Sequence, residues 1–137
     1  MRPRLHCLSL ALCGTLFAGC SHKDPDIAQR PDHTPYSKSA YTAGRADAER
    51  DLQAGRLVVE DFGFPRKGQE EYAGILQRRY HIEVRHVAGD IVDLKAYGHA
   101  YGYNDVSKPE IKRRFNDDVL EKAETEAAQH YDATTKK

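Results

Sequence analysis

The segment over residues 57–87 most constrains the fold, because two strand-like runs flank a helical pattern long enough to connect them. LVVEDFG, which starts at Leu57, is rich in β-branched residues, and HIEVRHV alternates Ile82 and Val84 with charged neighbours; both patterns are typical of strands. The apolar residues of the intervening GQEEYAGILQRRY recur at helical spacing, at Tyr72, Ile75, Leu76 and Tyr80. Strand, helix and strand in this order predict a right-handed crossover with parallel strands.

Helical patterns on both sides of this unit supply the cover that two strands need, since a two-stranded sheet alone is marginally stable. Residues 39–55 predict one helix with Gly55 as its left-handed end, and the apolar residues from Ile91 to Tyr101 predict another. Ser107 and Glu110 have the spacing of a capping box and predict a separate short helix. A final helix has its apolar face at Val119, Leu120, Ala123 and Ala127. We expect a small, mainly helical α/β domain: a βαβ unit whose two-stranded sheet is covered by about four helices.

The first twenty residues, MRPRLHCLSLALCGTLFAGC, have the three parts of a secretory signal peptide. Arg2 and Arg4 give a positive start, an apolar run covers residues 7–17, and small residues precede Cys20. The run is too short to span a bilayer, which takes about 20 apolar residues.

The cysteine at the cleavage position resembles the lipobox of bacterial lipoproteins, with Phe17 where that motif usually has leucine. The resemblance implies that Cys20 is diacylglycerylated and becomes the acylated first residue after cleavage. Ser21 next to it implies sorting to the outer membrane, so the expected location is the periplasmic face of that membrane, with the lipid bilayer as one partner.

The rest of the chain divides by composition into three parts. Residues 20–38 contain the lipidated cysteine and three prolines with few large apolar residues, which predicts an extended, flexible tether. Residues 39–131 form the globular domain, and residues 132–137 are expected to be a disordered tail.

Cysteine content and charge exclude several classes of function for the mature chain. The resemblance implies that Cys7 and Cys13 leave with the signal and that Cys20 is consumed by the lipid, so we expect no disulfide, no thiolate catalysis and no cysteine-bound zinc in the mature chain. Loss of Arg2 and Arg4 lowers the 21 basic residues to 19, against 21 acidic ones. Without a basic excess we expect no nucleic-acid partner.

Candidate catalytic groups are sparse, and we expect neither a metal nor a cofactor. His81 and His86 are five residues apart on a predicted strand, so their side chains point to opposite faces. Ser107 is explained by the capping box. The enzyme alternative is a small envelope hydrolase that pairs His99 or His86 with Asp90 or Asp93.

The stretch YGHAYGYND, residues 97–105, has the composition of a polar and aromatic binding surface. Its candidate partner-binding residues are Tyr97, His99, Tyr101, Tyr103 and Asn104. A structural interpretation competes: Gly102 would end a helix in a left-handed cap, with Tyr103 folded back on Tyr97. The favoured hypothesis is a non-enzymatic lipoprotein that engages an envelope protein or peptidoglycan. The other alternative is a lipoprotein that binds a small ligand in a tyrosine-lined pocket.

Overall fold

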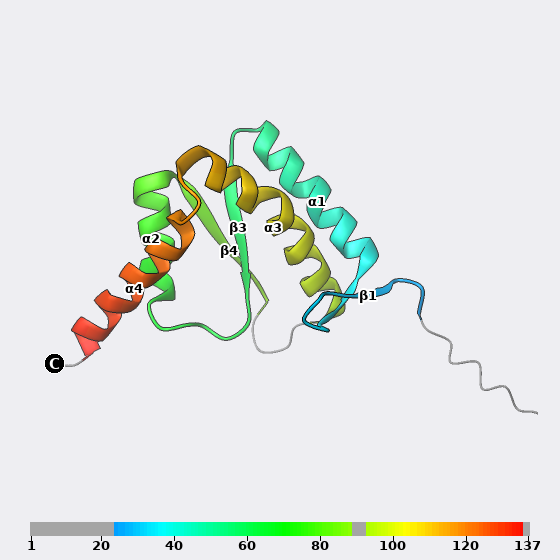
Figure 1. Cartoon of the computed structure of the whole chain (residues 1–137), viewed down its shortest axis with the longest axis horizontal. Coiled ribbons are helices and arrows are strands. Elements are labelled where there is room, and N and C mark those ends of the chain that lie inside the picture. The colour runs from blue at the N-terminus through cyan, green and yellow to red at the C-terminus, as the bar shows by residue number, and fades with distance from the viewer. Residues whose placement is uncertain (1–23, 89–92, 136–137) are drawn as a thin grey trace, which may run out of the picture.

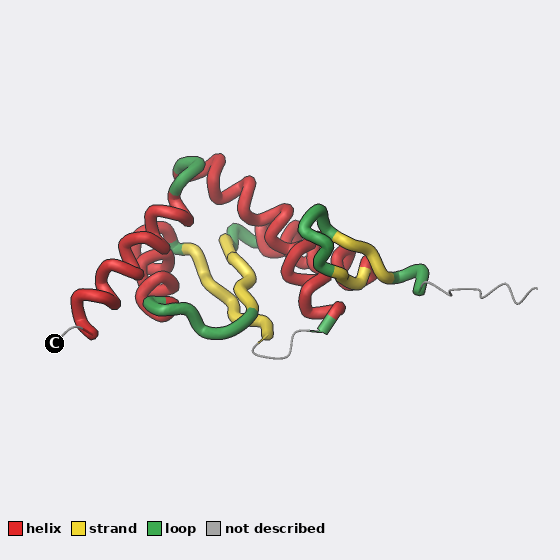
Figure 2. The backbone as a smooth tube through the Cα atoms, turned by 60° about the horizontal axis from the view of Figure 1, so that its bottom comes forward, coloured by secondary structure: helices red, strands yellow, loops and turns green. Residues whose placement is uncertain are grey.

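The computed structural model describes residues 24–88 and 93–135 of the 137-residue chain. Cys20 and the predicted signal segment lie outside the described residues, as do Asp90 and Ile91. The elements of the domain proper are α1 (Lys38–Gln53), β3 (Leu57–Phe62), α2 (Gln69–Tyr80), β4 (Ile82–Ala88), α3 (Leu94–Phe115) and α4 (Val119–Thr135). They form three layers, with β3 and β4 between the α2–α4 pair and the α1–α3 pair (Figure 1; Figure 2). The predicted mainly helical α/β fold is confirmed.

The two strands are parallel, as the crossover pattern predicts, and Leu57 lies opposite Ile82 at the start of the ladder. Alternation along β3 places Leu57 and Val59 in the core under α2 and α4, whereas Val58 faces α1 and α3. Two hydrophobic cores result. The larger contains Leu57, Val59, Tyr72, Ile75, Leu76, Ile82, Ile111, Val119, Ala123 and Ala127, and the smaller contains Ala48, Val58 and Tyr103.

Helix α3 is a single helix of 22 residues, so the predicted break between two shorter helices is wrong. Gly102 is helical and Pro109 lies inside the helix. Proline in a helix interior loses a hydrogen bond and costs about 3 kcal/mol. That cost is offset by one continuous buried face, because Tyr103, Ser107 and Ile111 recur every four residues and are all about 1% exposed or less. Burial of this face therefore overrides the local helix-start signal at Ser107.

The N-terminal residues correct the predicted tether. β1 (Ile27–Gln29) and β2 (Pro35–Ser37) form an antiparallel hairpin directly before α1. The Asp26 carboxylate accepts hydrogen bonds from the Ser37 hydroxyl and from the Ser39 backbone N–H at 2.8 Å, and Ser37 in turn caps α1. These capping bonds, together with the contacts of the Tyr36 ring with Tyr41 and Tyr101, hold the hairpin against α1 and α3. At the other end, α4 continues to Thr135, so residues 132–135 are helical rather than disordered.

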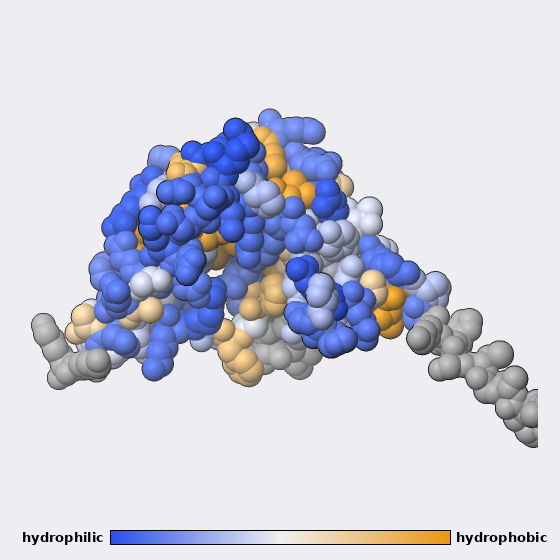
Figure 3. Space-filling view, viewed as in Figure 1, coloured by the Kyte–Doolittle hydropathy of each residue, from blue (hydrophilic) through white to orange (hydrophobic). Residues whose placement is uncertain are grey.

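The face of the molecule in Figure 3 is mostly hydrophilic, with hydrophobic residues in small, separate areas. Within residues 24–88 and 93–135, no helix combines the length and apolar character needed to cross a membrane.

Candidate functional site

The tyrosine-rich stretch 97–105 forms the N-terminal half of α3, and its side chains diverge to three sides of that helix. Gly98 and Gly102 face β2 and α1, His99 and Tyr103 face the sheet and α1, and Tyr97 and Tyr101 face the end of β3. Only some of the side chains in residues 97–105 are therefore available at the surface of the protein.

The glycines allow α1 and α3 to touch through their backbones. A Cβ atom at Gly102 would lie 1.9 Å from the carbonyl oxygen of Tyr41, and one at Gly98 would lie 2.4 Å from that of Ser37. From the other helix, a Cβ at Gly44 would lie 2.1 Å from the carbonyl oxygen of His99. The predicted cap at Gly102 is thus a helix-packing position, and the four-residue spacing of Gly98 and Gly102 was the signal for it.

His99 is held between two carboxylates. Its Nδ1 lies 2.8 Å from Glu60 Oε2 on β3, and its Nε2 lies 3.2 Å from Asp47 Oδ2 on α1. Burial lowers the pKa of His99, but the hydrogen bonds from Glu60 and Asp47 outweigh burial and raise the pKa above its usual value. Since a carboxylate can only accept, the arrangement favours the ring with both nitrogens protonated.

Tyr103 extends the same network beneath α1. Its hydroxyl donates to Asp51, whose carboxylate also contacts Arg56 and, at 3.4 Å, Arg85 on β4. Burial raises the pKa of Asp51, yet hydrogen bonds from Tyr103 and the arginines lower it overall. Burial and the bond to Asp51 both raise the pKa of Tyr103. We call the set Asp47, Asp51, Glu60, Arg85, His99 and Tyr103 the polar network.

Sequence reasoning found His99 and Tyr103 but missed the acidic members and Arg85. A signal existed for Glu60, because it occupies an inward position of a strand whose preceding three residues are all buried. Its side chain is only 1% exposed, and a buried carboxylate requires charged or hydrogen-bonding partners.

The network holds α1, α3 and the sheet together through charged and hydrogen-bonded contacts. Both ring nitrogens of His99 are occupied by carboxylates, so neither is free to take a proton from a substrate. Two of the other predicted acid–base groups also have partners: His86 contacts the Gln69 amide at 3.4 Å, and Asp93 caps α3 by accepting from Ala96 N–H. Asp90 lies outside the described residues.

Asn104 is 8% exposed and bonds to β3 instead of solvent. Its amide oxygen accepts from Glu60 N–H at 3.0 Å, and its amide nitrogen donates to Glu60 C=O at 2.7 Å. Together with the 1% exposure of Tyr103, this moves two of the five predicted partner-binding residues into the interior.

Tyr97 and Tyr101 remain at the surface, within a larger group that we call the aromatic surface: Arg30, Tyr36, Phe62, Tyr97 and Tyr101. The rings of Tyr97 and Tyr101 stack at 5.7 Å, and Phe62 meets both edge-on. The Arg30 guanidinium lies 4.3 Å from the centre of the Tyr101 ring, and Tyr36 meets that ring edge-on. Each of these residues is partly exposed.

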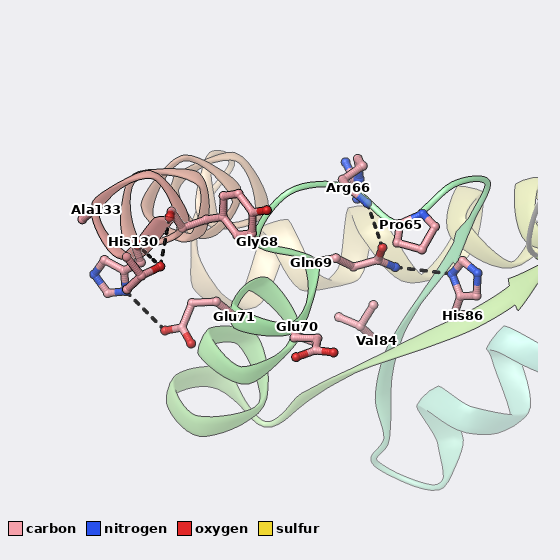
Figure 4. A pocket seen from close by; sticks show the side chains of 13 residues that line it. Pro65, Arg66, Gly68, Gln69, Glu70, Glu71, Val84, His86, His130 and Ala133 are labelled. Atoms are coloured by element: carbon pink, nitrogen blue, oxygen red, sulfur yellow. Dashed lines mark hydrogen bonds and ion pairs between the residues drawn. The ribbon is translucent and has the colours of Figure 1, made fainter. Parts of the chain in front are cut away.

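A cleft of about 1020 Å³ lies on the opposite side of the domain, around the first turns of α2 (Figure 4). Val84 and His86 of β4 border it on one side, and the C-terminal turns of α4 border it on the other. His130 Nδ1 lies 3.4 Å from Glu71 Oε1 at that far side. Among the described residues, no group of three or more histidine, cysteine or acidic side chains is arranged to hold a metal ion.

Comparison with known proteins gives no further assignment: no family model, no curated protein and no solved structure matches this chain.

Proposed function

We propose that this chain is a lipid-anchored binding module of the bacterial envelope, whose aromatic surface engages another envelope component. The anchor is Cys20, in the lipobox-like sequence that ends the predicted signal peptide, and the location is the periplasmic face of the outer membrane. The observation that carries the binding role is the partly exposed combination of stacked tyrosines and an arginine. Tyrosine and arginine are, with tryptophan, the residue types enriched among the energetically dominant residues of protein interfaces.

The chain between the proposed anchor and the hairpin is short, which supports a surface near the membrane. Asp24 is the first described residue and lies four positions after Cys20 in the sequence. Fully extended, this length of chain spans about 14 Å. The hairpin also carries Arg30 and Tyr36 of the aromatic surface. A short connection supports a partner at the membrane surface, such as an outer-membrane protein, over the more distant cell wall.

The anchor is tested by mass spectrometry of the N-terminal peptide after expression in a host that processes lipoproteins. We expect an acylated Cys20 in the full chain and unprocessed precursor for Cys20→Ala. An intact signal peptide on the wild-type chain, or cleavage at another residue without acylation, refutes the anchor.

The binding role is tested by photocrosslinking in intact cells, with benzoylphenylalanine in place of Tyr101. A matched position is Tyr131, a tyrosine that is 38% exposed on α4 at the cleft. A discrete protein adduct from position 101 and none from position 131 supports the proposal. A lysozyme-sensitive smear from position 101 identifies peptidoglycan as the partner, and no adduct from position 101 in any envelope fraction refutes the role of the aromatic surface.

The cleft favours one second candidate, a small-ligand-binding lipoprotein. Its volume of about 1020 Å³ is at the upper end of the range for small-molecule sites. Such a role predicts that a bound small molecule co-purifies with the chain and that Ala73→Trp, inside the cleft, removes it while Tyr101→Ala does not.

A further inference from the structure

The two edges of the central sheet differ in how they are covered. Helix α3 closes the outer edge of β3, since Tyr103 packs into the core on one side of the sheet and Ile111 into the core on the other. Asn104, between them, bonds to both backbone groups of Glu60 in place of a neighbouring strand. Across residues 24–88 and 93–135, no hydrogen bond reaches the outer edge of β4. β4 is therefore an open edge strand, the kind of edge that invites another strand.

The register shows which backbone groups lie on that edge. Because Glu60 directs its N–H and C=O toward Asn104, its neighbour Val59 directs its own toward β4. Val59 lies opposite Val84, and in a parallel ladder it bonds to the residues on either side of Val84. Glu83 and Arg85 thus face β3. Ile82, Val84 and His86 point their backbone groups outward.

We propose that β4 pairs with β4 of a second copy of this chain, antiparallel and about a two-fold axis at Val84. The two sheets join into one sheet of four strands. Val84 then bonds to Val84 of the second copy, and Ile82 bonds to His86 of the second copy, twice by symmetry. Each copy uses the same surface, as a two-fold interface requires.

Charge selects this register and favours a second copy over a foreign strand. With the axis at Val84, Glu83 lies opposite Arg85 of the second copy, and the reverse pair forms as well. These positions are not hydrogen-bonded, so opposing side chains approach closely. Moving the axis by one residue in either direction places Glu83 opposite Glu83 or Arg85 opposite Arg85. Within one copy Arg85 already lies 3.5 Å from Glu83 and 3.4 Å from Asp51 and Glu60. The Glu83 and Arg85 side chains are nevertheless 51% and 35% exposed, so each still presents surface to an opposing strand.

The α2 side of β4 leaves room for the added strand. Val84 and His86 border the cleft, and Figure 4 shows both side chains on β4 next to the first turn of α2. Opposing residues of an antiparallel pair share one face of the sheet. Val84 packs against the larger core and also borders this cleft, so the Val84 pair of the dimer lies where that core meets the cleft.

The test uses the full chain in mild detergent, by sedimentation velocity and residue-resolved amide exchange over a hundredfold range of protein concentration. We expect a monomer–dimer equilibrium in which the Val84 and His86 amides exchange more slowly as the dimer forms. The Glu83 and Arg85 amides, which bond to β3, serve as internal controls and stay unchanged. A chain that is monomeric throughout overturns the proposal, and so does a dimer that leaves the Val84 and His86 amides unprotected.

Two variants and one matched control test the pairing. Glu83→Lys replaces both attractive pairs with repulsive ones, so the dimer Kd should rise at least about tenfold. Glu49→Lys makes the same charge change on an exposed position of α1 and should leave the Kd unchanged. Val84→Pro removes an outward N–H without touching the β3–β4 ladder, so it should abolish the dimer while the far-ultraviolet circular dichroism stays native. Equal Kd values for the two lysine variants overturn the proposal. Protection of Val84 and His86 in a monomeric chain, seen only when another envelope protein is added, overturns it in favour of a foreign strand.

Discussion

Replacing Gly102 with alanine tests whether α1 and α3 meet through their backbones. The new Cβ would lie 1.9 Å from the carbonyl oxygen of Tyr41, whereas real Cβ atoms keep at least 3.0 Å from such an atom. The helices must therefore separate by at least 1.1 Å at this point. The obstructing atom belongs to a helix backbone, so it cannot rotate away as the end of a flexible side chain can. Gly44 and Gly98 make similar close backbone contacts, so α1 and α3 cannot separate at Gly102 alone without disturbing these contacts.

The expected loss of stability follows from two opposing effects. Overpacking of this kind costs about 1–3 kcal/mol, and a rigid backbone contact belongs at the upper end of that range. Alanine in a helix interior is favoured over glycine by about 1 kcal/mol. The net expectation is a decrease of about 2 kcal/mol in the free energy of unfolding, which lowers Tm by about 8 °C in a domain of this size.

The assay is urea unfolding at 25 °C followed by circular dichroism, with Gly74→Ala as the matched control. Gly74 also lies within a helix, but the nearest atom to a Cβ there is the guanidinium Nη1 of Arg78, which can move away. That variant should gain about 0.5–1 kcal/mol. If Gly102→Ala is as stable as the wild type or gains stability as Gly74→Ala does, α1 and α3 are not in backbone contact and the packing described above is wrong.

The pH dependence of stability tests the polar network. The folded pKa of His99 is raised, so its contribution is fully present below the unfolded value of about 6.5 and is lost as the pH rises through the folded value. Urea unfolding at pH 6 and pH 8.5 should show a decrease for the wild type that is smaller in His99→Gln; an identical decrease in both chains assigns the dependence to other groups. Ser107→Ala tests the continuous helix: the Ser107 hydroxyl is buried with no hydrogen-bond partner among the described residues, so its removal should leave stability unchanged or raise it by up to about 1 kcal/mol. A loss of about 1 kcal/mol would instead indicate a helix cap at Ser107.

The parts of the fold that sequence predicts are those where local pattern and burial agree. The crossover from Leu57 to Ala88 has strands with β-branched residues, a helix with one apolar face and connections of ordinary length, and all three are observed. In helix α3 the local pattern and burial disagree, because Ser107 and Pro109 are typical of a helix start although they lie inside the helix. The buried face through Tyr103, Ser107 and Ile111 is visible only once α3 is packed against its neighbours. The hairpin at residues 27–37 was missed because no local apolar pattern indicates it: the Asp26 carboxylate bonds to Ser37 and Ser39, and the Tyr36 ring contacts Tyr101 on α3.

For the candidate site, composition identifies residues 97–105 but does not show which of their side chains face the solvent. Tyrosines at 97, 101 and 103 look equivalent in sequence, yet the first two are partly exposed and the third is 1% exposed. The difference arises because Gly98 and Gly102 fix which side of α3 meets α1, and this rotates Tyr103 toward Asp51. The partners of His99 lie 39 and 52 residues away in the chain, so no local spacing indicates them.

The buried charged groups limit the directions in which Tyr97 and Tyr101 can point. Glu60 is almost fully buried, and separating it from His99 and Arg85 would leave an uncompensated carboxylate, which costs several kcal/mol. Ion pairs of this kind add little net stability over apolar packing, but they penalise every arrangement of α3 in which the partners do not meet. His99 lies between Tyr97 and Tyr101 on the same two turns of α3. Fixing its ring against β3 therefore also fixes the direction in which both tyrosines point. A partner that binds the aromatic surface meets side chains whose positions are already determined, so less conformational entropy is lost on binding.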